Sequence, residues 1–561
     1  MPSMGNLDAK LLNKSAIGAT FLMMGQIFTK IFTFILNQLL LRYISSNVFG
    51  ITSFIEFLIS CSLFYSREGI RLACQRINKN DQIKKNDEKN QIYDNTFIGT
   101  IQKIINLSYI PIIIGLPISI ILLSSQLNIW NYKFHNISFI LIWGSIILEL
   151  ILEPFYNLNQ FELNFKIRTK IESISLIIKC ILQFSCFIYF NKKSNGKLDN
   201  GCYVLSFVIG QFFYSLTNFS LYLLNYKYHK KYKENTIFLK KIFQNNNDND
   251  NDNNDNNFFY FDKKAIEYWK NILIQLLFKY LLTEGDKFII NYLCSIDEQG
   301  IFALINNYGS LITRLIFAPI EETLRLYLTK LFSSDQQQHY LQLQKKNLLI
   351  NILNLLIKFY LYLSFFILIF APPNTKFLLE LIVGKNWSSE FFIKTFKIYW
   401  LYLPFLSING IMEAIFYSLA DDSIEILNYS KYMILTSVIF IFNSIVLIKF
   451  FNLSIVGLII ANIINMLLRI VYCFKFLSKF INDKDMNLLS NLLLNDSNNF
   501  YCTISAIIIY LIHSMVIKNT QVSNFTDFVK SSILGFTLLC IFLIIERKLI
   551  IEKILPKKKI S

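Results

Sequence analysis

The chain has 561 residues, of which 53% are hydrophobic, and its formal net charge is +17. A soluble protein of this length would divide into domains with polar surfaces, whereas here apolar runs of about twenty residues, long enough to cross a bilayer as helices, recur along the whole chain. Composition therefore indicates an all-α polytopic membrane protein and excludes a soluble globular enzyme; the excess of Lys and Arg belongs in loops on one side of the membrane and predicts no nucleic-acid partner.

The apolar runs predict about fourteen transmembrane helices. The first run is too long for the hydrophobic region of a cleavable signal peptide, so none is expected. In chain order the predicted spans are 16–43, 48–66, 98–125, 137–161, 171–190, 202–225, 267–293, 300–320, 347–371, 391–420, 428–450, 452–478, 500–518 and 530–551.

The distribution of basic residues predicts the orientation of the chain. With a cytosolic N-terminus, the loops on the cytosolic side hold roughly three to four times as many Lys and Arg as those on the other side, as the positive-inside rule requires. Loop 191–201, with its three lysines, is the exception. An even number of spans places both termini in the cytosol.

A polar tract divides the chain near its middle. Residues 245–257 read NNNDNDNDNNDNN and contain no apolar side chain, so we expect this tract to be disordered. We predict a first helical bundle of about six helices at 1–242, a linker at 243–264, a second bundle at 265–478, and two additional helices with a basic tail at 479–561.

The stretch 281–325 consists of two apolar runs joined by a short polar turn, and it carries groups that lipid should reject. An ionisable group at membrane depth is costly unless it faces a partner or water. The polar residues in question are Glu284, Asp286, Lys287, Asn306, Asn307, Arg314, Glu321 and Glu322. Because helical spacing places several of them on one face, we expect that face to be enclosed.

Other spans carry further polar groups, which together suggest a water-filled cavity between the bundles. Its basic excess suits an anionic ligand, since arginine grips a phosphate with two hydrogen bonds and lysine acts as a point charge. We assign to substrate binding Lys30, Arg42, Arg67, Lys279, Glu284, Asp286, Lys287, Asn307, Arg314 and Arg469. We assign to gating and ion pairs Glu68, Glu149, Glu153, Glu321, Glu322 and Glu413.

Simpler interpretations remain open for single residues. Near helix ends, Lys and Arg extend to the lipid headgroups, and this is the favoured interpretation for Arg42 and Arg67. Glu149 and Glu153 lie four residues apart on one helix face. In the simpler interpretation their whole role is to pair with basic neighbours and so fix two helices together. Glu321 and Glu322 are best placed at the cytosolic mouth of the cavity.

Signatures of enzymes and metal sites are missing from the sequence. It has no GxxxxGK[ST], Gly-x-Ser-x-Gly or His-Glu-x-x-His pattern, four histidines, and nine cysteines without a CxxC pair. We therefore expect no catalytic residue, no cofactor, no metal and no disulfide framework. The last residues, Lys558-Lys559-Ile560-Ser561, match the dilysine signal for retrieval to the endoplasmic reticulum, although a basic tail is also ordinary on the cytosolic side.

Several of these stretches also carry a family resemblance. Residues 282–288 (LTEGDKF) and 297–322 (DEQGIFALINNYGSLITRLIFAPIEE) resemble the signature region of the eukaryotic Rft family. The resemblance continues in order along nearly the whole chain. Its other segments are 28–45 (FTKIFTFILNQLLLRYIS), 65–74 (YSREGIRLAC), 148–160 (LELILEPFYNLNQ), 406–414 (LSINGIMEA) and 456–470 (VGLIIANIINMLLRI).

The resemblance implies the fold of the multidrug/oligosaccharidyl-lipid/polysaccharide exporters, with two pseudo-symmetric bundles around a central cavity. It implies a flippase that moves the dolichol-diphosphate-linked oligomannose intermediate of N-glycosylation to the lumenal leaflet of the endoplasmic reticulum membrane. The alternative is an accessory protein that supports other proteins of that pathway without transport. An exporter of organic cations is disfavoured, because the basic cavity would repel its substrates. Expected partners are the dolichol-linked oligosaccharide and membrane lipids.

Overall fold

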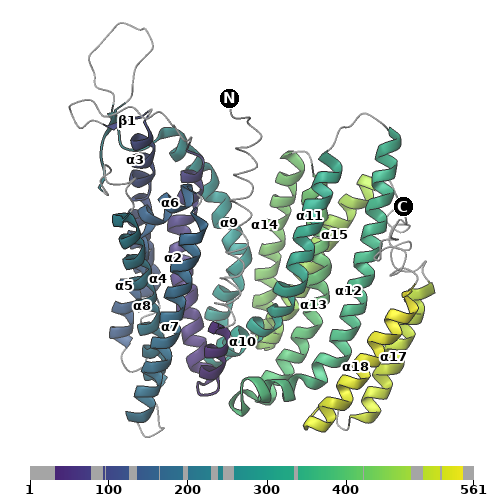
Figure 1. Ribbon diagram of the computed structural model, residues 1–561. Helices are drawn as coiled ribbons and strands as arrows, with labels where there is room; N and C mark the ends of the chain where they lie inside the picture. Colours follow the sequence, from purple (N-terminus) through teal and green to yellow (C-terminus); the bar gives the residue numbers. More distant parts are fainter. Residues whose placement is uncertain are drawn as a thin grey trace, which may run out of the picture. The chain divides into compact units, whose positions relative to one another are not determined.

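The computed structural model is almost entirely helical (Figure 1). It describes residues 32–77, 92–94, 96–125, 135–162, 164–193, 200–228, 238–243, 258–333, 339–420, 423–481, 497–517 and 521–547. By its internal contacts the chain forms two compact units, residues 1–287 and 288–561. The predicted all-α membrane fold is confirmed.

The first unit holds the helices up to α9 and one small sheet. Its helices are α2 (Ser46–Gln75), α3 (Phe97–Leu107), α4 (Ile110–Ser124), α5 (His135–Ile151), α6 (Glu153–Phe161), α7 (Phe165–Lys193), α8 (Asn200–Tyr228) and most of α9 (Lys263–Leu293). Helix α8 packs against α5 and α7, and α2 packs against α4. Two of the boundaries follow from proline: α4 starts just before Pro111 and α6 just before Pro154, since the residue before a proline disfavours helix.

The second unit is organised around α13 (Glu390–Leu419), which packs against α11, α12 and α15. Its buried core includes Phe317, Tyr360, Phe416 and Tyr429. The other elements are α10 (Ile296–Ile312), η2 (Thr313–Phe317), α11 (Ala318–Ser333), α12 (His339–Ile382), η3 (Lys385–Trp387), α14 (Ser423–Ile445), η4 (Val446–Phe450), α15 (Ser454–Ile481), α17 (Ser497–Val516) and α18 (Phe525–Ile545).

Among the described residues, 12 helices are long and apolar enough to cross a membrane, and they match twelve of the predicted spans. The other two predicted spans are 16–43 and 267–293. Of the first, the structure describes residues from 32 on, as the short apolar helix Phe32–Leu41. Helix α9 covers the second, but charged residues interrupt its apolar sequence. The count of fourteen stays a prediction.

The polar tract predicted as a disordered linker lies outside the described residues. Its two flanks belong to the first unit, where β2 (Ile242–Phe243) and β3 (Phe258–Phe259) pair as antiparallel strands. Helix α9 then packs on α2, where Trp269 lies so close to Gly69 that a Cβ there would be 2.8 Å from the indole ring. The bundle bounds 1–242 and 265–478 stay a prediction.

The last two helices are fastened to α12 by buried polar contacts at two levels. At one level, Asn374 donates to the Ser531 hydroxyl (2.7 Å), which also lies 3.0 Å from His513 Nε2. At the other, the Tyr362 hydroxyl donates to Glu546 (2.7 Å), and Lys358 lies 3.7 Å from the same carboxylate. Polar contacts between helices in lipid fix their register, so α17 and α18 are part of the second unit rather than a loose appendage.

Candidate functional site

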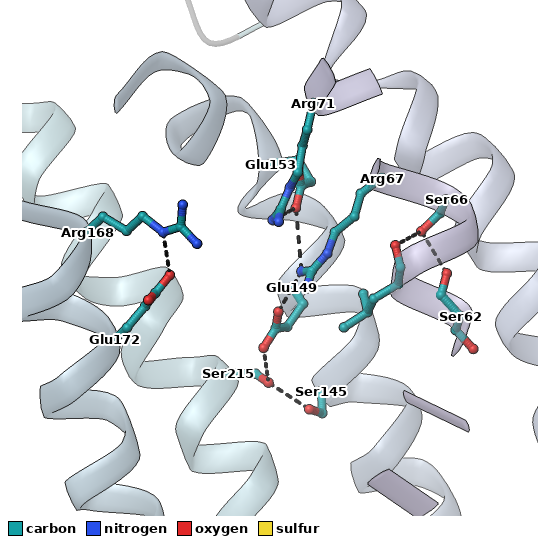
Figure 2. A network of polar contacts seen from close by, with 11 residues as sticks. Ser62, Ser66, Arg67, Arg71, Ser145, Glu149, Glu153, Arg168, Glu172 and Ser215 are labelled. Atoms are coloured by element: carbon teal, nitrogen blue, oxygen red, sulfur yellow. Dashed lines mark hydrogen bonds and ion pairs between the residues drawn. The ribbon is translucent and has the colours of Figure 1, made fainter. Parts of the chain in front are cut away.

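Two arginines on α2 face two glutamates at the junction of α5 and α6 (Figure 2). Arg67 donates to Glu149 Oε2 at 2.9 Å and lies 3.6 Å from Glu153 Oε1. Arg71 binds Glu153 with two hydrogen bonds, of 3.0 and 2.6 Å. The four residues form two rungs one helical turn apart, and we call them the arginine–glutamate ladder.

The glutamates of the ladder are buried, its arginines are partly buried, and its charges balance. The Glu153 side chain is 0% exposed and that of Glu149 8%. The Arg71 guanidinium also lies over the Tyr156 ring, 3.8 Å from its centroid. Glu149 accepts a further hydrogen bond from Ser215 on α8 (3.3 Å). With every oxygen of Glu153 paired to a guanidinium, the ladder meets the condition under which buried charges are tolerated.

The ladder bears on one predicted helix end and on two interpretations of its residues. The second span was predicted to end at residue 66, with Arg67 and Arg71 in the loop that follows; helix α2 continues to Gln75, and both arginines pair with glutamates of α5 and α6. Extension of Arg67 toward the headgroups stays a prediction; the structure places its guanidinium against Glu149. The alternative that Glu149 and Glu153 pair with basic residues to fix two helices is what the structure contains.

A second pair lies beside the ladder and is more exposed. Arg168 and Glu172 on α7 are one turn apart and 2.9 Å from each other, with side chains 37% and 36% exposed. Arg168 reaches the Tyr156 ring at 5.0 Å, on which Arg71 also lies. Figure 2 shows this pair set apart from the ladder, on its own helix. Exposed pairs of this kind contribute little to stability.

Arg314 in the second unit has a different environment. It lies in η2, a short π-helical segment inside a membrane-spanning stretch, and its side chain is exposed. The guanidinium folds back on its own helix, where it donates to the Ser310 hydroxyl (2.7 Å) and to the Asn307 side chain (3.3 Å). Among the described residues no carboxylate forms an ion pair with it. Single π-helical turns are frequent at functional sites.

Glu321, Glu413 and Arg469 meet where α11, α13 and α15 pack together. The Tyr429 hydroxyl donates to Glu413 (2.8 Å), and Arg469 lies 3.6 Å from the same carboxylate. Glu321 lies against Gly410, where a side chain would collide with it. Buried Asn409 Oδ1, Asn465 Oδ1 and Arg469 Nε have no hydrogen-bond partner among the described residues. Buried polar groups are usually hydrogen-bonded; unpaired buried atoms also occur elsewhere among the described residues, for example Asn157 Oδ1 and Asn218 Oδ1.

Gly410 gives a direct test of the Glu321 placement. A Cβ at Gly410 would lie 1.8 Å from Glu321 Oε1, so Gly410→Ala must displace the carboxylate and is expected to cost about 1–3 kcal/mol of unfolding free energy. Thermal unfolding of the purified protein in detergent measures it. Gly535→Ala is the matched control, because its nearest neighbour is a Phe366 ring atom at 3.4 Å. The double variant Gly410→Ala/Glu321→Ala removes the collision and should recover stability. If Gly410→Ala and Gly535→Ala lower the unfolding temperature equally, the placement of Glu321 is contradicted.

The remaining predicted residues are scattered. Glu284 pairs with Lys287 one turn away (2.6 Å), and Asp286 accepts from the Lys287 backbone (2.8 Å). Arg42 follows the helix Phe32–Leu41 and is exposed, Glu68 is half-buried beside the ladder, and Glu322 is exposed on α11. Lys30, the Lys279 side chain, Lys558 and Lys559 lie outside what the structure describes. Which of these residues touch substrate stays a prediction.

Three residues that hydrogen-bond to predicted site residues were themselves not predicted: Arg71, Tyr429 and Ser310. Arg71 could have been found, because Arg67/Arg71 and Glu149/Glu153 share the same four-residue spacing in two apolar stretches. Tyr429 gives no such signal, since tyrosine is abundant at membrane interfaces.

Comparison with known proteins places the whole chain in one family. A sequence profile described as "Rft protein" matches residues 14–555. The Man(5)GlcNAc(2)-PP-dolichol translocation protein RFT1 of Kluyveromyces lactis is 40% identical over 98% of this chain and 99% of its own length. The protein of the same name from Saccharomyces cerevisiae is 39% identical over 98% and 97%.

The fold also resembles a solved structure. The lipid II flippase MurJ, in an inward closed conformation, superposes with a TM-score of 0.57 over 94% of this chain and 99% of MurJ, at 13% identity. At that identity the likeness concerns the fold alone.

Proposed function

The chain belongs to the Rft protein family, and from this we propose that it translocates a dolichol-diphosphate-linked oligosaccharide between membrane leaflets. In this proposal the substrate moves from the cytosolic to the lumenal leaflet of the endoplasmic reticulum membrane for protein N-glycosylation. The relatives carry translocation of this lipid in their names.

The physical problem in such a transfer is the head of the lipid. The diphosphate and the sugars must pass a hydrocarbon layer about 30 Å thick, while the polyprenyl tail can stay in lipid. The protein therefore has to offer cations at membrane depth that are not already neutralised by its own carboxylates. Translocation breaks no covalent bond, so the residues need only bind the diphosphate and release it.

Arg314 is the observation that carries the proposal. It is an exposed arginine inside a membrane-spanning stretch, held in place by Asn307 and Ser310, without a carboxylate partner among the described residues. An ionisable group in such a position is a functional-site candidate by default. The guanidinium offers donors in a planar fork that match a phosphate. We assign it the first contact with the diphosphate.

The arginines of the ladder differ from Arg314 because carboxylates already neutralise them, and we give the ladder a structural role. Arg67 and Arg71 are already paired with Glu149 and Glu153, so binding a diphosphate there would first require breaking buried ion pairs. We assign the ladder to holding α2 against α5 and α6. The junction of Glu321, Glu413 and Arg469 has a net charge of −1 when all three are ionised, and we assign it to gating.

Location and orientation complete the proposal. Both termini lie in the cytosol, and Lys558 and Lys559 form a retrieval signal for the endoplasmic reticulum. Other proteins of the N-glycosylation pathway are proposed partners. The competing function, an accessory protein without transport activity, would use the same charges only to fix helices together.

A leaflet assay separates the two functions. Cells depleted of the protein are converted to sealed microsomes, and the share of the lipid-linked oligosaccharide that a sugar-binding lectin reaches from outside is measured. The proposal predicts that this share rises on depletion, because the intermediate stays in the cytosolic leaflet. An accessory role after translocation predicts that the intermediate accumulates inside the microsomes, which would overturn the proposal.

A further inference from the structure

The three-stranded sheet of the first unit has two chemically different faces. Strand β1 (Ile92–Tyr93) pairs in parallel with β2, and β2 pairs in antiparallel with β3. The register places Ile92, Ile242 and Phe259 in one row and Tyr93, Phe243 and Phe258 in the other. In the first row Ile92 and Ile242 are buried (5% and 0% exposed), and β1 and β2 contact α3. The second row is entirely aromatic.

Polar side chains of α3 hold the sheet in place. Asn106 donates to the backbone carbonyls of Lys240 and Tyr260, both at 2.7 Å, and accepts from the Lys240 amide (3.2 Å). Gln102 donates to the Phe238 carbonyl (2.9 Å), and Lys103 forms ion pairs with Asp94 and Asp262. These side chains fix the backbone on both sides of the polar tract, so the outer face has a defined shape.

The outer face combines exposed aromatic rings with exposed lysines. Phe238 is 75% exposed and Phe258 45%. Neighbouring rings lie close together: Phe243 and Phe258 have centroids 6.4 Å apart, and Phe258 and Tyr260 6.2 Å. The Lys241 ammonium lies 4.0 Å over the Phe258 ring. Within the described stretches around the sheet, further exposed lysines are Lys240, Lys263 and Lys264, against one exposed acid, Glu267. We call this set the aromatic–lysine face.

Its place in the chain brings this face close to the membrane surface. The apolar stretch that begins at Phe97 follows β1 after three residues, and α9 begins three residues after β3. Helix α3, on which the sheet rests, is itself part of that apolar stretch. The sheet is therefore held at the end of a membrane span, the depth at which aromatic rings and lysines are enriched in membrane proteins.

We propose that the aromatic–lysine face binds anionic phospholipid headgroups at the membrane surface. Exposed rings insert at the headgroup level, and each lysine near an anionic surface strengthens binding about fivefold. An anionic leaflet supplies the opposite charge that the exposed lysines lack on this face, at the depth where the sheet is held. The contact ties the sheet, and with it the loop ends that flank the polar tract, to the bilayer.

Site-specific photo-crosslinking of the full chain tests this proposal. Benzoylphenylalanine replaces Phe258, and the protein is placed in nanodiscs of phosphatidylcholine with or without phosphatidylserine. We expect lipid adducts at position 258 by mass spectrometry, several-fold more with phosphatidylserine. The probe at Phe442, exposed within a span, should give adducts in both lipids, and at buried Phe416 in neither. No lipid adduct at 258, or the same yield in both lipids, would overturn the proposal.

A charge variant checks the electrostatic part. Lys240→Glu/Lys241→Glu should reduce the phosphatidylserine-dependent yield by about tenfold or more. It leaves the hydrogen bonds of the sheet in place, because Asn106 binds the Lys240 backbone and, among the described residues, no side-chain hydrogen bond holds Lys241; the cation–π contact of Lys241 with Phe258 is part of the face under test. The same probe irradiated in native membranes distinguishes the competing occupant: a protein crosslink at 258 in place of lipid adducts would assign the face to a protein partner. Translocation does not enter either readout.

Discussion

Arg314→Glu is expected to abolish translocation while leaving the protein folded. Removing the guanidinium loses a charge-assisted contact with phosphate, of about 1.5–3 kcal/mol, and the carboxylate adds repulsion against the diphosphate. Together these should lower transport by about 100-fold or more. The fold should tolerate the change, because the described partners of Arg314 lie on its own helix, at Asn307 and Ser310. Underglycosylation of a reporter glycoprotein in cells carrying this variant alone is the readout.

Two further variants make the Arg314 result specific. Arg314→Lys keeps the charge but loses the planar fork, so it should retain part of the activity. Arg325→Glu is the matched control, since Arg325 is also exposed and lies further along the same helical stretch, on α11. Normal glycosylation in Arg314→Glu cells, at wild-type protein level, would remove Arg314 from the transport path. Equal defects in Arg325→Glu would point to net charge rather than to a site.

Glu153→Gln is expected to destabilise the first unit strongly. The substitution keeps the size of the side chain but leaves Arg71 without its anionic partner in a buried position. Breaking a buried pair from one side costs about 3–5 kcal/mol, since the remaining charge is uncompensated. We expect a large fall in the thermal unfolding temperature in detergent, and a low yield of protein from membranes.

Glu172→Gln provides the comparison for the ladder. It breaks the half-exposed pair between Glu172 and Arg168, which should cost about 1 kcal/mol or less. A double variant, Glu153→Gln/Arg71→Met, removes both buried charges and should recover much of the lost stability. If Glu153→Gln and Glu172→Gln unfold at the same temperature, the ladder does not hold α2 to α5 and α6.

The spans were predictable from the sequence because the bilayer sets their length and excludes polar residues. Helix ends were less so. Arg67 and Arg71 looked like the start of a loop, because an unpaired arginine belongs outside the hydrocarbon; their partners are 82 residues away in the chain. Only the fold brings Glu149 and Glu153 to them. The matched spacing of the two pairs was the one available signal.

The small sheet could not be predicted at all. Each strand has two residues, too few for an alternating pattern, and the pairing depends on Asn106 binding backbone on both sides of the polar tract. For the site, the sequence supplied the residue types and their spacing. It did not distinguish Arg67, neutralised by Glu149, from Arg314, which has no such partner among the described residues, and that difference decides which arginine remains available to a phosphate.

Reconstitution tests the central claim most directly. The purified chain in liposomes, with labelled dolichol-diphosphate-linked oligosaccharide in one leaflet, is predicted to speed its transfer to the other leaflet well above the rate in protein-free vesicles. Arg325→Glu should retain this acceleration and Arg314→Glu should lose it. Transfer by the wild-type chain at the rate of protein-free vesicles would contradict a translocator and leave the accessory role.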